Sequence, residues 1–192
     1  MQRILLVSAL LLLLAGPAAA GELLVNGDFE QALDVGWTDT VENEAGLFAF
    51  DRADTFGQPT PGFAAKVHKE LARYASLRQT VDVPNVDLTL TFDGRFLIGG
   101  GSSTCWPVAS VWVRYGDAAG LELGNTRICL SSVYSDWTKS DTVSLIEIAD
   151  TTGAWHNYTL ELKDELTNHL PGINPDSVRK ITIDLYAYDN GT

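Results

Sequence analysis

The sequence predicts an all-β protein that folds as an antiparallel β-sandwich. Apolar and polar residues alternate with period two over many short segments, and glycine, proline and asparagine separate these segments. Only residues 164–170 have a helical character, and Pro171-Gly172 ends that stretch after about one turn. We therefore expect sheets with one face packed on a core and the other face in water.

The alternation assigns the predicted strands in chain order. It is clearest in four segments, residues 74–81, 86–93, 157–162 and 181–188. Further strands are predicted at residues 22–26, 46–51, 63–68, 108–115, 121–130 and 143–148. Because the sequence contains no repeat, linker or low-complexity segment, residues 21–192 are predicted to form a single domain.

Residues 1–20 have the features of a secretory signal peptide. Arg3 supplies the positive charge, residues 4–15 are apolar, and Ala18 to Ala20 form a small-residue cleavage site. The alternative, a membrane anchor, is disfavoured because the apolar run is shorter than the ~20 residues of a spanning helix. We expect cleavage near Ala20 and a secreted protein, extracellular or periplasmic, without a membrane span.

The formal net charge of −12 bears on the expected partners. Nucleic acids and anionic lipids bind basic surfaces, so neither is an expected partner. An acidic surface is also ordinary for a soluble exported protein, so the charge by itself does not identify a ligand.

The two cysteines, Cys105 and Cys129, are predicted to form a disulfide. Export places them in an oxidising compartment, and their flanking segments are predicted to form a hairpin with its tip at residues 116–120. A turn centred on Ala118 places the two cysteines almost opposite each other. On the chain-entropy model the bridge would stabilise the fold by roughly 3 kcal/mol. A zinc site is disfavoured because no second cysteine pair exists and histidine is sparse.

The segment Leu24 to Glu30 combines a turn, an aromatic residue and two carboxylates. Asn26-Gly27 favours positive φ and therefore a tight turn. In an extended segment Asp28 and Glu30 project to one face while Phe29 projects to the other. The segment is thus predicted to anchor the chain to the core and to offer a pair of hard oxygen ligands.

Several segments together resemble a known family. They are residues 26–30, Gly36-Trp37, 75–81, 88–92, 155–160 and 180–185. The chain resembles the jelly-roll carbohydrate-binding modules that accompany secreted xylanases and cellulases, in the galactose-binding-like superfamily, over most of residues 22–190. The resemblance implies a jelly-roll sandwich that binds polysaccharide and does not catalyse a reaction.

The resemblance also implies a structural calcium ion. In that family the N-terminal motif and an aspartate on the last strand commonly hold it, and here Glu30 matches first and Asp28 second. Calcium accepts such an oxygen-only ligand set. The alternative is that both carboxylates lie at a solvated strand end.

The C-terminal end departs from the family pattern. Family members continue through a Gly-rich turn into a final strand, whereas this chain stops at Asp189-Asn190-Gly191-Thr192. The last strand, with the aspartate that would bind calcium, is therefore not expected here. Either the chain is a truncated product or another element completes the sheet, and an open edge would be available for strand exchange or for a partner.

Two predicted strands place potential sugar-binding side chains opposite their apolar residues. Trp112 and Arg114 lie on the polar side of one strand, and Asp184 and Tyr186 lie on the polar side of the other. If the strands share a sheet, these four side chains would line a groove that Asp93 or Arg95 could extend. Aromatic rings stack on sugar rings, and charged groups bind their hydroxyls.

Two alternatives to this groove remain open. Trp112 and the tyrosines would instead form a second small core under a loop. A ligand would otherwise bind at a loop site formed by Trp106, Tyr134 and Trp137, which all lie in turn-rich segments.

No sequence pattern indicates catalysis. The histidines have no metal-ligand spacing, and neither a Gly-x-Ser-x-Gly motif nor a phosphate-binding glycine-rich loop is present. We therefore expect a secreted, non-catalytic polysaccharide-binding domain. The alternative is a structural or adhesive extracellular sandwich without a sugar site.

Overall fold

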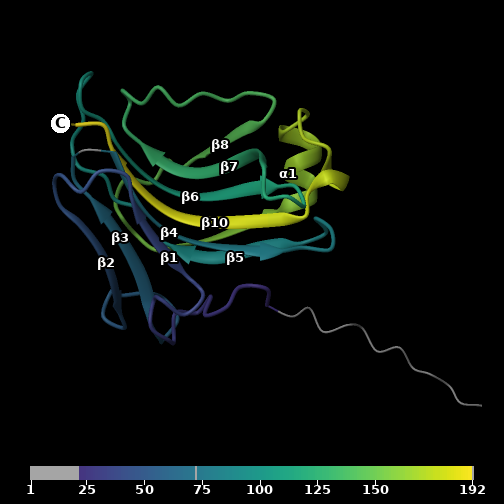
Figure 1. The fold of residues 1–192 in the computed structure, drawn as a ribbon. Helices are drawn as coiled ribbons and strands as arrows, with labels where there is room; N and C mark the ends of the chain where they lie inside the picture. Colours follow the sequence, from purple (N-terminus) through teal and green to yellow (C-terminus); the bar gives the residue numbers. More distant parts are fainter. Residues whose placement is uncertain (1–21, 72, 192) are drawn as a thin grey trace, which may run out of the picture.

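Ten strands in the described part of the chain form one six-stranded sheet and two two-stranded sheets (Figure 1). The computed structural model describes residues 22–71 and 73–191, so the predicted signal peptide at residues 1–20 lies outside the described residues. The elements in chain order are β1 (Thr38–Val41), β2 (Phe48–Ala53), β3 (Ala64–Lys69), β4 (Arg73–Asp82), β5 (Thr89–Gly94), β6 (Pro107–Gly116), β7 (Glu122–Ser131), β8 (Val143–Glu147), β9 (His156–Glu161), α1 (Leu162–His169), the 3₁₀-helix η1 (Pro175–Ser177) and β10 (Lys180–Asp189).

The large sheet has the strand order β1-β4-β10-β6-β7-β8. Its neighbours are antiparallel except β7 and β8, which are parallel. β2 pairs with β3 and β5 pairs with β9, both antiparallel. In Figure 1, α1 lies at one end of the large sheet and the β2–β3 pair at the other. The chain is an all-β sandwich, as predicted, with one parallel pair that the antiparallel prediction did not include.

The main hydrophobic core lies against one face of the six-stranded sheet. Val113 and Tyr115 of β6 are completely buried on this face. The opposing layer is formed by β5, β9 and α1, which contribute buried residues such as Leu160 and Leu166. Alternate residues of β6 point to opposite faces, so the apolar half of the predicted alternation forms this core.

The helix is longer than predicted and starts earlier. It begins at Leu162, directly after β9, and spans two turns rather than one. Leu162, Leu166 and Leu170 are spaced by four residues and lie on one side, which packs on the core. The chain then turns at Pro171, as expected. Within the part of the chain that the structure describes, no helix is long and apolar enough to cross a membrane.

The structure contains a strand at each predicted segment except residues 22–26. There the backbone turns, with positive φ at Asn26 (53°) and Phe29 (56°). Val25 is nevertheless held to the sheet, because its N–H donates to Gln79 Oε1 at 2.7 Å and its carbonyl accepts from Gln79 Nε2 at 2.8 Å. The side-chain amide of Gln79 thus makes the two backbone hydrogen bonds that a neighbouring strand would otherwise make with Val25. The alternation pattern also does not reveal β1.

The predicted disulfide is wrong, because Cys105 and Cys129 are both free. The β6–β7 hairpin forms, but its register pairs Cys129 with Ser110 and shifts just before the turn. A turn centred on Ala118 therefore misplaces the partner of Cys129. Cys105 lies before β6, and its thiol donates a hydrogen bond to Asp189 Oδ1 at 3.2 Å.

The expected open edge at the C-terminal strand is also wrong for the described residues. β10 pairs with β4 along one side and with β6 along the other, from Lys180 to Asp189. The edge strands of the large sheet are β1 and β8. Strand exchange in this sheet would have to use one of those two edges.

Candidate functional site

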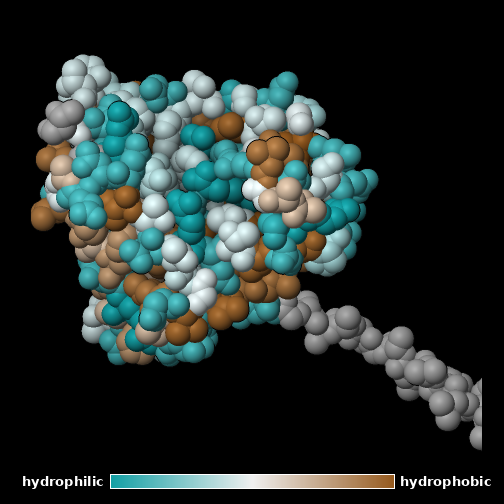
Figure 2. Space-filling view, viewed as in Figure 1, coloured by the Kyte–Doolittle hydropathy of each residue, from teal (hydrophilic) through white to brown (hydrophobic). Residues whose placement is uncertain are grey.

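One face of the six-stranded sheet, which we call the polar face, carries polar and aromatic side chains. Four strands supply them: Tyr74, Ser76, Arg78 and Thr80 from β4; Thr182, Asp184, Tyr186 and Tyr188 from β10; Ser110, Trp112 and Arg114 from β6; and Asn125 and Arg127 from β7. The opposing layer of the sandwich packs on the other face. Figure 2 shows a hollowed, hydrophilic area over the middle of the sheet on this side. A sheet covered on only one side leaves the other side accessible to a ligand.

The strand register brings together the four predicted sugar-binding residues. Asp184 of β10 is paired with Trp112 of β6, and Arg114 lies two positions further along β6 on the same face. The Tyr186 ring stacks on the Trp112 ring with their centroids 4.6 Å apart. The four side chains therefore form one cluster in the middle of the polar face.

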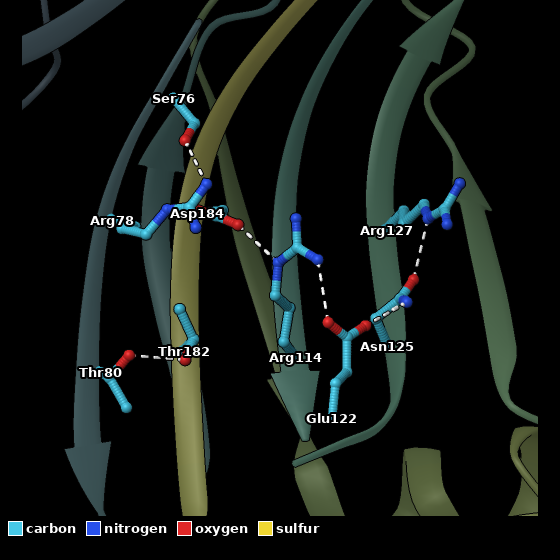
Figure 3. Close-up of polar contacts among 9 residues, drawn as sticks. All are labelled: Ser76, Arg78, Thr80, Arg114, Glu122, Asn125, Arg127, Thr182 and Asp184. Carbon is cyan, nitrogen blue, oxygen red and sulfur yellow. Dashed lines mark hydrogen bonds and ion pairs between the residues drawn. The ribbon is translucent and has the colours of Figure 1, made fainter. Parts of the chain in front are cut away.

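Asp184 is the centre of an ion-pair network (Figure 3). Its carboxylate is fully buried, with Oδ1 3.1 Å from Arg78 Nε and Oδ2 2.6 Å from Arg114 Nε. Arg114 also contacts Glu122, with 3.0 Å between Nη1 and Oε2. Burial lowers the pKa of Arg114, but the two carboxylates outweigh it and the pKa is raised. Asp184 thus holds two arginines in position, and its own oxygens are not accessible to a sugar.

Trp112 is covered rather than exposed. Only 7% of its surface is accessible, since Tyr186 stacks on it and Trp137 meets it edge-on with centroids 5.3 Å apart. The guanidinium carbons of Arg114 and Arg127 lie 4.2 and 4.0 Å from the centre of its ring. The predicted stacking of Trp112 on a sugar does not fit this burial. Its surroundings agree with the alternative given above, in which Trp112 belongs to a second small core under a loop.

The covering loop, residues 132–142, follows from the parallel pairing of β7 and β8. A parallel pair needs a connection that returns along the length of a strand, and Figure 1 shows this segment running back beside β7. It carries Tyr134, which is 49% exposed, and Trp137, which packs on Trp112 and Tyr188. The predicted groove and the predicted loop site are therefore parts of one site.

Trp106, the third aromatic residue of the predicted loop site, has a packing role. It is buried, and its ring lies 5.1 Å from that of Tyr188. Together with Val108 and Cys129 it forms a second small hydrophobic cluster. It therefore packs against Tyr188 and holds that ring in place, and it does not itself offer a surface for a ligand.

Arg78 and Arg127 are members of the site that the sequence reasoning did not select. The alternation already places Arg78 on the polar side of its strand, so the missing information is that β4 lies beside β10. Arg127 donates from Nε to Asn125 Oδ1 at 2.8 Å. Asp93 and Arg95, considered as extensions of the groove, do not join the polar face, because β5 pairs with β9 in the opposing layer.

Two cavities flank the aromatic cluster. One, of about 250 Å³, lies under the 132–142 loop and is lined by Cys129, Ser131, Ser132, Val133, Ser135, Trp137, Leu145 and Glu147. The other, of about 140 Å³, lies near the β6–β7 turn and is lined by Thr80, Arg114, Tyr115, Gly116, Gly120, Glu122, Lys180 and Thr182. The second cavity offers the hydroxyl and charged groups that bind sugar hydroxyls.

Cys129 in the first cavity is a poor nucleophile. Burial and, to a lesser extent, Glu147 raise the pKa of its thiol to about 11. Because the reactive form of cysteine is the thiolate, this thiol stays inert at neutral pH.

The predicted calcium ligands, Asp28 and Glu30, lie in the N-terminal turn rather than in an extended segment. Asp28 Oδ1 accepts from the backbone N–H of Glu30 at 3.2 Å, and Glu30 Oε1 accepts from that of Phe63 at 2.9 Å. In the described residues, no three His, Cys, Asp or Glu side chains gather to hold a metal ion. Calcium would therefore need backbone oxygens and water for most of its roughly 6–8 ligands.

The same turn is organised by Asn26. Its Nδ2 donates to the carbonyl of Ala32 at 3.0 Å, and its Oδ1 accepts from the N–H of Gln31 at 2.8 Å. Its own carbonyl accepts from Trp37 Nε1 at 3.1 Å. The motif therefore anchors the N-terminal turn to the core through the buried Trp37, as its aromatic residues suggest.

Comparison with known proteins does not assign the chain to a family. No protein-family model matches the sequence, and no curated protein matches it. The resemblance to carbohydrate-binding modules therefore stays a prediction, and function has to be argued from the polar face itself.

Proposed function

We propose that this protein is a secreted, non-catalytic carbohydrate-binding domain that holds a polysaccharide on the polar face. The observation that supports the proposal is the cluster of aromatic rings and fixed arginines on the side of the large sheet that faces away from the opposing layer. Flat rings beside a few oriented polar groups are the combination that binds a sugar ring and its hydroxyls.

The burial of Trp112 changes the role of each residue in this proposal. The stacking surface would be Trp137 with Tyr134 and Tyr188, which are partly or well exposed. Trp112 and Tyr186 would support that surface from the sheet. Hydrogen bonds to hydroxyls would come from the arginines that Asp184 orients and from the threonines of the smaller cavity.

The test is the binding of the mature chain, residues 21–192, to a panel of insoluble and soluble polysaccharides. We expect affinity in the micromolar range, about −8 kcal/mol or weaker. Trp137→Ala should abolish retention. Trp155→Ala is the matched control, because Trp155 is also partly buried but adjoins β9 in the opposing layer.

No retention of a folded protein by any polysaccharide would contradict the proposal. The alternative, a structural or adhesive extracellular protein, would then lead. Its signature would be self-association through β1 or β8, the two edge strands, that added sugar does not change.

A jelly-roll topology of the galactose-binding-like kind and a structural calcium ion belong to the same proposal. The calcium part is tested by thermal unfolding with and without a chelator, for the native chain and for Glu30→Gln. If calcium binds there, chelation lowers the melting temperature of the native chain but not that of the variant. An equal melting temperature with and without chelator would remove calcium from the proposal.

A further inference from the structure

Arg127 is a partly buried cation that forms no ion pair within the described residues. The carboxylates of Asp184 and Glu122 pair with the other two arginines of the polar face. Arg127 instead donates from Nε to the neutral amide of Asn125 at 2.8 Å. In a chain with a net charge of −12, a cation in the centre of a sheet face without an acidic partner calls for an explanation.

The surroundings of Arg127 make its positive charge costly to leave without an acidic partner. Its guanidinium lies over Trp112 at 4.0 Å and over Trp137 at 4.6 Å, while Arg114 lies over Trp112 at 4.2 Å. Burial and the charge of Arg114 both lower the pKa of Arg127. Two like charges on one ring repel each other, so a bound anion between them would be stabilised by both.

Both arginines keep hydrogen-bond donors that such an anion could use. Figure 3 shows one terminal nitrogen of Arg114 bonded to Glu122, while the other points toward the same end of the sheet as the guanidinium of Arg127. Each has a terminal nitrogen that makes no contact among the residues drawn. A guanidinium offers two parallel N–H groups, which match the two oxygens of a carboxylate.

We propose that the polar face recognises an acidic polysaccharide, and that Arg127, together with Arg114, binds the carboxylate of a uronic acid residue. This rests on the proposed carbohydrate binding and specifies its ligand class. In a uronic acid the carboxylate is attached directly to the sugar ring. The ring would then lie against Trp137 while the carboxylate reaches the two arginines, since Trp137 and Arg127 are adjacent.

The acidity of the whole chain determines how the proposed binding should depend on salt. A protein with a net charge of −12 does not attract a polyanion over long distances. Binding would depend on the local contact at the two arginines, so we expect moderate salt to leave it largely intact. Proteins that bind polyanions through a broad basic surface lose affinity steeply under the same conditions.

The experiment compares homogalacturonan with its methyl ester, which has the same backbone without the charge. We expect the mature chain to bind the acid form at least about tenfold more tightly, as for a charged hydrogen bond. Arg127→Gln should remove most of that preference, and Arg127→Lys should restore part of it. Arg95→Gln is the matched control, because it removes the same charge from an exposed position in the other layer.

Four outcomes would overturn the inference, and the experiment distinguishes them from one another. Equal binding of the two polymers, unchanged in Arg127→Gln, would leave carbohydrate binding standing and remove the acidic ligand. The same loss in Arg95→Gln would show a general charge effect. Binding of a sulfated polymer but not of the uronate would show that the two arginines recognise a sulfate group and not a carboxylate. No binding of any polysaccharide by a protein whose near-ultraviolet circular dichroism is native would overturn both proposals.

Discussion

The two faces of the six-stranded sheet come from the same alternating strands but are buried in different ways. On the core face, side chains such as Leu77 and Val113 are covered by a second layer of β5, β9 and α1. On the polar face, Asp184 and Trp112 are covered mainly by neighbouring side chains and by one loop. Period-two alternation therefore predicts which face a residue occupies, but it does not predict how exposed that face is.

The largest expected effect tests the importance of the polar face for stability. Asp184→Ala removes the carboxylate between two arginines and leaves their charges without a partner. We expect unfolding by urea to show a loss of about 4 kcal/mol, because breaking a buried ion pair is strongly destabilising. Thr80→Ala, exposed on the same face, should cost less than about 1 kcal/mol. A small loss for Asp184→Ala would mean that the network adds no stability.

The second prediction provides the reference value from the core face. Leu77 is 2% exposed, and Leu77→Ala would leave a cavity in the main core. We expect a loss of about 3 kcal/mol in the same urea experiment. If Leu77→Ala cost far more than Asp184→Ala, the core face would stabilise the sheet and the polar face would contribute little to its stability.

The third prediction concerns alkaline pH. The folded pKa of Cys129 is about 11 against an ordinary value of 9.0, so above pH 9 the unfolded state loses the thiol proton first. Stability that is fully present below pH 9 should therefore fall as the pH rises to about 11, by up to about 2 kcal/mol.

The measurement is urea unfolding at several pH values in the presence of a reductant. Cys129→Ala should lose less stability than the native chain between pH 9 and pH 11. Parallel curves for the two proteins would show that Cys129 titrates normally and that the polar face is more open to water at this point.

The smallest expected effect concerns the loop. Trp137→Ala removes the ring that covers Trp112 and should cost about 1 kcal/mol, in the range of an aromatic pair. The more informative readout is fluorescence, since acrylamide should quench Trp112 more strongly once it is uncovered. Unchanged quenching would indicate that the loop does not cover the polar face in solution.

The alternation placed Trp112 and Arg114 on the polar side of one strand and Asp184 and Tyr186 on the polar side of another, and their grouping depended on the assumption that these strands share a sheet, which the structure confirms. It could not show that β10 lies between β4 and β6, which brings Arg78 to the same carboxylate. Strand order depends on contacts between distant segments, and no local pattern encodes it.

The errors have similar physical origins. The cysteine pairing depended on the exact centre of a turn, and a small shift in register separated Cys105 from Cys129. The cover over Trp112 depended on the parallel pairing of β7 and β8. One signal was present, because residues 132–142 are too long a connection for a tight hairpin.

The central position of β10 has a consequence for how the molecule folds. β4 and β6 are separated in the sheet by the last strand of the chain, so neither can complete its pairing until residues 180–189 are available. The large sheet therefore depends on contacts between widely separated segments, and such topologies fold slowly. A chain released before that segment would expose two unpaired strand edges in the middle of its sheet. We expect a chain that ends before Lys180 to remain unfolded and prone to aggregation, whatever the quality of its core residues.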